Sequence, residues 1–115
     1  MKIQKVVIIL FCILIFSVSA IAAEQDMVRI QGMIMELDLK RNKMVVNEKV
    51  FFWDANTLFY NENASPIKGD KFKTDTWVYI EGVRDSNIRQ ITIKKIYHLP
   101  KYIERDEGDL YPFIH

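Results

Sequence analysis

The stretch MVRIQGMIMELDL, residues 27–39, reverses the side of a strand on which its apolar residues lie. Val28 and Ile30 occupy one phase of the two-residue alternation of a β-strand, whereas the apolar residues after Gly32, such as Leu37, occupy the other. A phase reversal at a glycine is typical of a β-bulge or a sharp bend, because one extra residue turns the following side chains to the opposite face. We therefore expect a bulge or a strong bend at Gly32, in a long first strand that serves both halves of a closed barrel.

Beyond this strand the chain continues as short β-segments separated by turns, with no long run at helical spacing. Asn47 and Glu48 predict a tight hairpin turn. Residues 55–76 are polar and irregular, and a short strand or a helical turn is expected around 57–60. The predicted strands after the first are KMVV at 43–46, KVFFWD at 49–54, TWVYIEGV at 76–83 and IRQITIKKIYHL at 88–99.

Five strands in this order, with a long third connection, predict an all-β fold, a small five-stranded OB-like barrel. Closure of the barrel removes the unpaired edges that a small open sheet would leave. The expected organisation is a signal peptide at 1–22, the OB-like barrel domain at 27–99 and a C-terminal tail at 100–115.

Four segments, IQGMIMELDLKRNKMVVN, Thr57, FKTDTWVYIEGV and IRQITIKKI, resemble the small exported bacterial OB-fold proteins. The pattern of those proteins is G-x-I-x-x-I-D, a mid-chain Thr, G-x-W-V-x-V-x-G and a final isoleucine-rich strand. The resemblance covers residues 28–96, and it departs from the pattern at Thr74-Asp75, where such proteins often carry a glycine. It implies the barrel fold and, by analogy, a binding or accessory role.

The N-terminal residues have the three parts of a secretory signal peptide. Lys2 and Lys5 precede an apolar run, and the motif AIA at 20–22 supplies the small residues that signal peptidase requires. Cleavage is expected at 22/23 or 23/24, which makes the mature protein periplasmic or secreted. The alternative is an uncleaved anchor, because the apolar stretch 6–23 counts eighteen residues. Both alternatives export the rest of the chain, since the lysines favour the cytoplasmic side.

The residues after this segment exclude several classes of function. Removal of 1–22 leaves 93 of 115 residues without any cysteine, because the single Cys12 lies in the removed segment. The two lysines of the segment leave with it, so fourteen of the sixteen basic residues remain against fifteen acidic ones. This balance provides no basic stripe for nucleic acid. No disulfide is expected in the mature domain.

No residues with the spacing of a catalytic or metal site are present. His98 and His115 have no cysteine beside them, so neither a metal site nor a cofactor is expected. No nucleophile motif of the G-x-S-x-G type occurs. Glu36 and Asp38 share a strand face and are interpreted as its solvated side rather than as an acid–base pair. We therefore expect a protein that is not an enzyme.

The aromatic run FFW at 51–53 is the best candidate for a binding site. Adjacent residues of a strand point to opposite faces, so Phe51 and Trp53 share one side and Phe52 takes the other. The second and third strands form the usual ligand face of an OB-fold, where an outward aromatic with basic neighbours could stack on a sugar ring or a peptide side chain. The alternative is that the long third connection or the tail covers the outer aromatics, and both readings apply to Trp77 and Tyr79. The predicted ligand-binding residues are Arg41, Lys43, Phe51, Trp53 and Arg84.

The tail carries an apolar cluster behind an acidic spacer. Leu110, Tyr111, Phe113 and Ile114 would lose favourable burial in water, so we expect them to dock on the barrel itself or, alternatively, on a partner. The expected function is an exported, non-enzymatic binding or accessory domain of the bacterial cell envelope. It would recognise a peptide, a glycan or an envelope partner protein through its β surface. The alternative is an envelope stress or structural protein that self-associates or is anchored by a retained N-terminal helix, and the oligomeric state stays open.

Overall fold

The structure, a computed structural model, describes residues 26–85, 87 and 89–114. The signal peptide expected at 1–22 lies outside these residues and stays a prediction. Among the described residues, no helix has both the length and the apolar composition to cross a membrane. The elements are β1 (Asp26–Asp38), β2 (Lys43–Val46), β3 (Lys49–Phe52), β4 (Leu58–Tyr60), η1 (Gly69–Lys71), β5 (Trp77–Arg84), β6 (Ile91–Leu99) and η2 (Arg105–Leu110), where η denotes a 3-10 helix.

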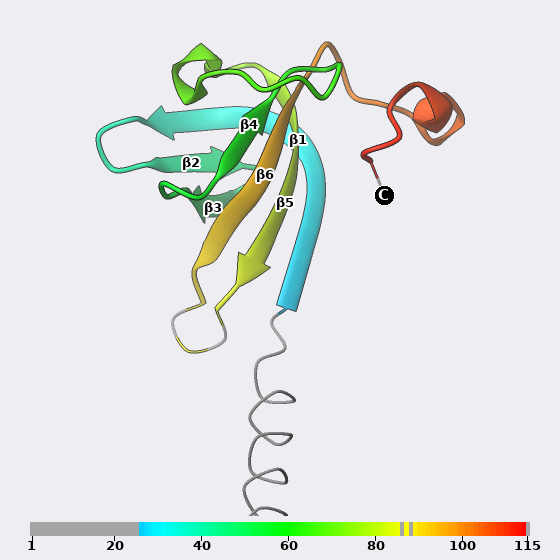
Figure 1. Ribbon diagram of the computed structural model, residues 1–115. Helices are drawn as coiled ribbons and strands as arrows, with labels where there is room; N and C mark the ends of the chain where they lie inside the picture. The colour runs from blue at the N-terminus through cyan, green and yellow to red at the C-terminus, as the bar shows by residue number, and fades with distance from the viewer. Residues whose placement is uncertain (1–25, 86, 88, 115) are drawn as a thin grey trace, which may run out of the picture.

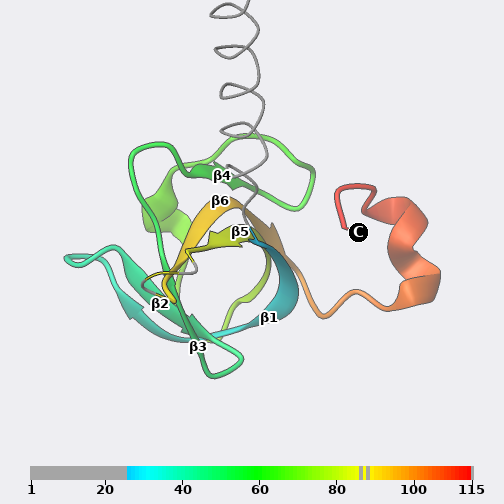
Figure 2. The ribbon, with the colours of Figure 1, turned by 90° about the horizontal axis from the view of Figure 1, so that it is seen from below.

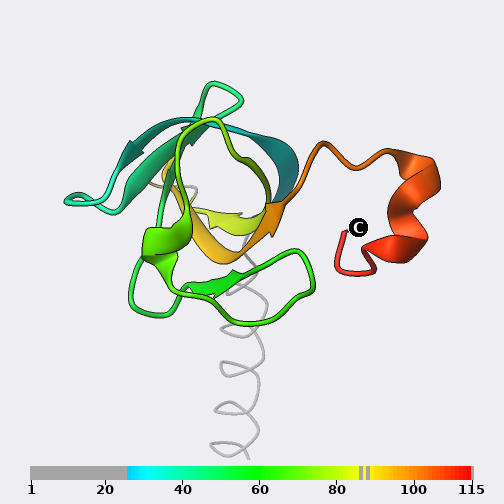
Figure 3. The same ribbon diagram turned by 90° about the horizontal axis from the view of Figure 1, so that it is seen from above.

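Five strands close into a ring, which confirms the predicted all-β, OB-like barrel. The ring order is β1-β2-β3-β6-β5, and β5 returns to β1 (Figures 1 and 2). All neighbours in the ring are antiparallel except β3 and β6, which run parallel and pair only at Phe51–Phe52 with Ile91–Thr92. The additional strand β4 pairs in parallel with β6 and is the short strand expected around 57–60. The long connection from β4 to β5 crosses the upper end of the barrel (Figure 3).

The phase reversal in β1 is real, but the bulge that was predicted at Gly32 does not lie there. β1 pairs with β5 from Asp26 to Met33 without a register shift, so no bulge lies at Gly32 in this pairing. The shift lies in the pairing of β1 with β2, between Ile34 and Glu36. Ile34 is fully buried in the phase that precedes the shift, and Met35 is 59% exposed. The extra residue of the bulge is therefore Met35. The sequence pattern placed the reversal too early, because Ile34 is buried in the same phase as Val28 and Ile30.

Gly32 has a different role, because the β2–β3 hairpin turn approaches it closely. A Cβ atom at Gly32 would lie 2.6 Å from both the Val46 Cγ1 and the Asn47 Oδ1. Backbone φ is not positive at this residue, so close approach rather than conformational freedom requires the glycine. Asn47 fixes the approach by donating from its Nδ2 to the Gln31 carbonyl at 2.9 Å.

The core lies inside the barrel and is closed by the long connection. Phe72, from this connection, enters the core, and its ring centroid lies 5.6 Å from that of Phe59. Thr57, just before β4, holds the segment between β3 and β4 to β6, because its hydroxyl donates to the buried Ile93 carbonyl at 2.6 Å. The buried core residues are Ile34, Met44, Val46, Phe51, Phe72, Val78, Ile80, Ile91, Ile93 and Ile96.

The C-terminal tail docks on the outside of β5 and β6, which confirms the prediction that it packs on its own barrel. Phe113 stacks on Tyr97 of β6, with ring centroids 4.0 Å apart and planes 6° apart. Ile103 is anchored by Gln31 of β1, which donates to its carbonyl at 3.1 Å and accepts from its N–H at 2.9 Å. Leu110 is 74% exposed, so this member of the predicted cluster does not dock. The segment that includes η2 stands beside the barrel in Figure 1.

Candidate binding surface

The outer surface of β1, β2 and β3 carries two rows of side chains that come from registered positions. The register places Glu36 beside Val45 and Val45 beside Val50. The next row joins Asp38, Lys43 and Phe52 in the same way. The inner positions between them belong to Leu37, Met44 and Phe51, which pack on the core. We call these six outer residues the hairpin face: Glu36, Asp38, Lys43, Val45, Val50 and Phe52.

Apolar side chains of the hairpin face and its border reach the solvent. Val50 is 40% exposed, and beside the face Met35 is 59% and Leu39 is 53% exposed. Val45 and Phe52 are half-buried. A surface that combines exposed apolar groups with charged groups at its border is suited to contact with another macromolecule.

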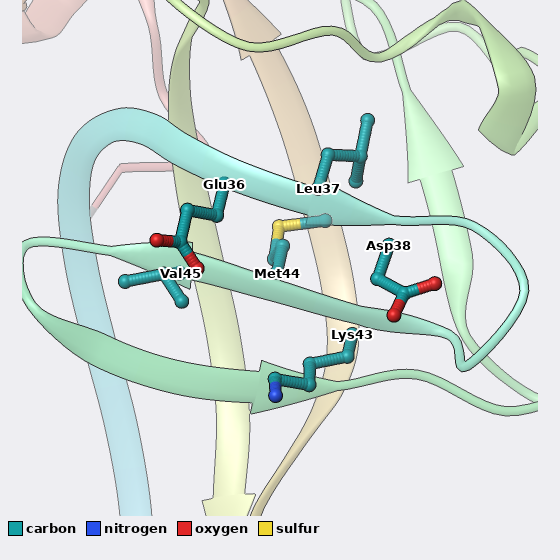
Figure 4. A pocket seen from close by; sticks show the side chains of 6 residues that line it. All are labelled: Glu36, Leu37, Asp38, Lys43, Met44 and Val45. Atoms are coloured by element: carbon teal, nitrogen blue, oxygen red, sulfur yellow. The ribbon is translucent and has the colours of Figure 1, made fainter.

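The charged border of the face is only partly neutralised. Arg41 Nε lies 3.8 Å from Asp38 Oδ2, and the other oxygen of Asp38 accepts the N–H groups of Lys40 and Arg41 at 3.2 Å each. Asp38 thus holds the β1–β2 turn as well as the arginine. Within the described residues Glu36 forms no ion pair, so its carboxylate is available to a partner. Figure 4 shows Glu36 and Asp38 directed to one side of β1 and Leu37 to the other.

The hollow at this face is too small for a typical ligand. Its volume is about 140 Å³, and it is lined by residues of β1 and β2 (Figure 4). Pockets for small molecules usually enclose about 300–1,000 Å³. The hairpin face is therefore an extended contact surface rather than a small-molecule pocket.

The structure places the predicted aromatic residues on the inner side. Phe51 is fully buried in the core, so it offers no surface to a ligand, and that part of the prediction is corrected. Trp53 is half-buried and packs against the core, with its ring edge-on to Phe59 at a centroid distance of 6.3 Å. The shared side of Phe51 and Trp53 faces the interior because β3 pairs with β6 and closes the barrel over it. The outward aromatic residue is Phe52.

The predicted basic residues are divided between two places. Lys43 belongs to the hairpin face, and Arg41 lies in the turn beside it. Arg84 lies at the end of β5, where it is paired with Ile91, so β6 separates it from β3. Its Nη1 lies 3.3 Å from Asp26 Oδ2. Arg41 and Lys43 therefore remain predicted binding residues, and Phe52, which was not among the predicted residues, is paired with Lys43. Arg84 is not part of the same surface.

The tail packs on the two other outer aromatic residues, Trp77 and Tyr79. This agrees with the alternative, stated in the sequence analysis, that the tail covers them. Tyr79 is 1% exposed, and the ring centroid of Phe113 lies 6.1 Å from its own. Trp77 meets Tyr102 edge-on at 5.8 Å. Burial raises the pKa of the Tyr97 hydroxyl above its ordinary value, and the negative charge of Glu81 raises it further. The outer face of β5 and β6 is thus occupied by the protein's own tail.

A second hollow, which the sequence did not predict, lies beside the long connection. Its volume is about 630 Å³, and it is lined by Asn61, Ile67, Lys68, Asp70, Lys71 and His98. The connection has no regular alternation, so its approach to His98 has no signal in the sequence. Across the described part of the chain, no three His, Cys, Asp or Glu side chains gather as a metal site.

No known protein family matches the sequence. No curated protein matches it either. Similar solved structures include apo-CusF from Escherichia coli, with a TM-score of 0.50 and 15% identity over 67% of this chain and 92% of that chain. The structure of CusF with Ag(I), also from Escherichia coli, has a TM-score of 0.50 and 17% identity, and the match covers 68% of this chain and 98% of that chain. The fimbrial biogenesis protein PilY2 from Pseudomonas aeruginosa PAO1 has a TM-score of 0.52 and 16% identity, and the match covers 76% of this chain and 94% of that chain. At these identities the likeness shows that the chain shares the barrel fold.

Proposed function

We propose that this protein is an exported, non-enzymatic binding domain of the bacterial cell envelope that holds a partner protein on its hairpin face. One observation carries the proposal, namely that the two outer faces are treated differently. The chain covers the aromatic face of β5 and β6 with its own tail, whereas the hairpin face leaves Val50 and the bordering Met35 exposed. An accessory role in assembly at the envelope agrees with the name of the structurally similar PilY2.

A protein partner fits this face better than a glycan. Sugar rings are commonly held on flat, exposed aromatic rings, but Phe51 is buried and Trp53 packs on the core. The outward side chains are aliphatic, with the single half-buried ring of Phe52. Apolar side chains with a charged border match the usual composition of a protein interface. The partner is expected to place a basic group opposite Glu36.

Site-specific photocrosslinking in the exporting cell tests the proposal. A benzophenone amino acid at Val50 would lie in the hairpin face, and the same amino acid at Lys73, exposed on the long connection, is the matched control. A discrete protein adduct from position 50, and none from position 73, is expected. Equal adducts from both positions, no adduct from position 50, or an adduct that carries glycan without protein would contradict the proposal.

Export is tested separately by the intact mass of the protein recovered from the periplasm or the medium. Loss of the first 22 or 23 residues is the expected result. A recovered chain that still begins at Met1 would show that the segment is retained as an anchor. In that case the partner would be sought at the membrane surface.

A further inference from the structure

Among the residues that the structure describes, the first half of β1 has a partner strand on only one of its two edges. β1 pairs with β5 along Asp26–Met33, but its pairing with β2 begins only at Ile34. The β2–β3 turn ends at the level of Gly32, where Asn47 bonds to Gln31. In Figures 1 and 2 no strand lies along the lower half of β1 on the side away from β5. Residues 26–30 therefore form an open strand edge within an otherwise closed barrel.

Hydrogen bonds identify the backbone groups that face this edge. In a β-strand the N–H and C=O of one residue point to the same side, and successive residues alternate. Ile34 donates to the Thr76 carbonyl at 2.9 Å and accepts from Asp75 N–H at 2.8 Å, so its backbone faces the β5 side. The Gln31 carbonyl instead accepts from Asn47, on the other side. From Asp26 to Ile34, even-numbered residues of β1 thus face β5, and odd-numbered residues face the other edge.

Met27 and Arg29 are the odd-numbered residues that remain without a strand partner on this edge. The unbroken register of β1 with β5 carries the alternation from Ile34 back to residue 26. In the described part of the chain, no hydrogen bond is formed at the free edge by Met27 or Arg29. Their N–H and C=O groups repeat every second residue, about 7 Å apart. Only another extended polypeptide backbone repeats donors and acceptors at this spacing.

The side chains along the edge do not oppose the approach of another strand. Natural edge strands are usually protected by proline, by a bulge or by charged side chains. Residues 26–31 contain no proline and no register shift. The two charged side chains of this edge, Asp26 and Arg29, already form ion pairs with residues of β5. Arg29 lies 3.9 Å from Glu81, and Asp26 lies 3.3 Å from Arg84. An incoming strand therefore meets a regular edge without excess charge.

We propose that the free edge of β1, at residues 26–30, is a strand-addition site for an extended, uncharged polypeptide segment of a partner protein. The site goes beyond the hairpin face and does not rest on it. The added strand would bond to Met27 and Arg29 and place alternate apolar side chains beside the half-buried Val28 and Ile30. In an antiparallel pairing of two copies centred on Val28, Asp26 would face Ile30 of the second copy. This poor match favours a different partner segment over a second copy.

Amide hydrogen exchange by NMR tests the site on the protein purified from the exporting cell. In the free protein, the amides of Val28 and Ile30 are expected to exchange slowly and those of Met27 and Arg29 quickly. The probes are acetylated hexapeptides in which Val alternates with Thr or Gln. At least one of them is expected to slow exchange at Met27 and Arg29 by about tenfold or more. The matched controls are the same peptides with N-methyl groups on every second residue in either phase, which block one or the other edge of the peptide.

Two variants separate the edge from the fold. Met27→Pro removes an N–H that faces the free edge and leaves the bonds to β5 intact, whereas Met27→Ala keeps the N–H. Peptide binding is expected to weaken about tenfold in the proline variant, as the loss of one backbone hydrogen bond implies, and to be unchanged in the alanine variant. If the proline variant fails to fold, the two N-methylated peptide series still decide the question.

Several results would overturn the inference. The site does not exist if no peptide protects Met27 and Arg29, or if both N-methylated series bind as well as the unmodified peptides. Protection in the free protein that rises with its concentration would assign the edge to a second copy. Peptide-induced shifts confined to the hairpin face would support the proposed function and reject the strand-addition site.

Discussion

The hydroxyl of Thr57 ties the segment between β3 and β4 to β6, and its removal gives a sharp test of the fold. Thr57 is 8% exposed, and its Oγ1 donates to the Ile93 carbonyl at 2.6 Å and accepts from Asp54 N–H at 3.1 Å. Thr57→Val keeps nearly the same volume but leaves both groups without this partner. Water can reach the exposed Asp54, whereas the Ile93 carbonyl lies among buried groups.

The magnitude follows from the buried carbonyl. A buried polar group left without a partner costs about 1–3 kcal/mol, so we expect Thr57→Val to lower the free energy of unfolding by about 2 kcal/mol. For a domain of this size, each kcal/mol lowers the melting temperature by roughly 4–8 °C, so a fall of about 8–16 °C is expected. Thr57→Ser keeps the hydroxyl and should lose only about 0.5–1 kcal/mol for the missing methyl group.

Urea unfolding followed by tryptophan fluorescence provides the measurement, since Trp53 and Trp77 lie on opposite sides of the barrel wall. Wild type, Thr57→Val and Thr57→Ser are compared at the same pH and protein concentration. The reasoning is refuted if the valine variant is as stable as wild type. It is also refuted if serine destabilises as much as valine, because the hydroxyl would then not be the stabilising group.

Three further predictions concern packing and charge. Gly32→Ala should destabilise by about 1–3 kcal/mol in thermal unfolding, because a Cβ atom there collides with the β2–β3 turn, and an unchanged melting temperature would contradict this account. Phe113→Ala should lower the free energy of unfolding by about 1–2 kcal/mol and increase the binding of a hydrophobic dye. Leu110→Ala, at an exposed position, should do neither, and equal effects of the two variants would show that the tail does not dock through the Phe113 ring. The hydrogen bond from Lys101 lowers the pKa of Glu107. The pair therefore stabilises the docked tail fully at a pH above the pKa of glutamate in the unfolded chain, and this stabilisation is lost as the pH falls through the lowered pKa of the folded state. An NMR titration should therefore find a higher pKa for Glu107 in Lys101→Met, and an unchanged value would mean that the pair does not form in solution.

Much of the fold could be predicted because β alternation is a local property of the chain. The segments at 43–46, 49–54, 76–83 and 88–99 contain β2, β3, β6 and nearly all of β5. The phase reversal in the first strand was also visible, but its position was not. Ile34 continues the first phase past Gly32, and only the pairing with β2 shows that Met35 is the extra residue.

The candidate site was predicted less well, for a reason that the FFW run illustrates. Alternation indicates correctly that Phe51 and Trp53 share a side, but it does not indicate which side faces the interior. That choice depends on the pairing of β3 with β6, between residues about forty positions apart. The same pairing leaves Phe52 outward and puts β6 between β3 and Arg84.

The sequence by itself determined the β class, the turns, the absence of cysteine after residue 12 and the need of the apolar tail for cover, since each depends on residue type or on neighbours in the chain. Only the tertiary structure decided that Phe113 covers Tyr97. It also decided that, within the described part of the chain, Val50 of the hairpin face stays exposed and the edge at Met27 and Arg29 has no strand partner. These features depend on which distant segments meet. Long-range contacts are selected by the packing of the whole barrel, so no local pattern contains them.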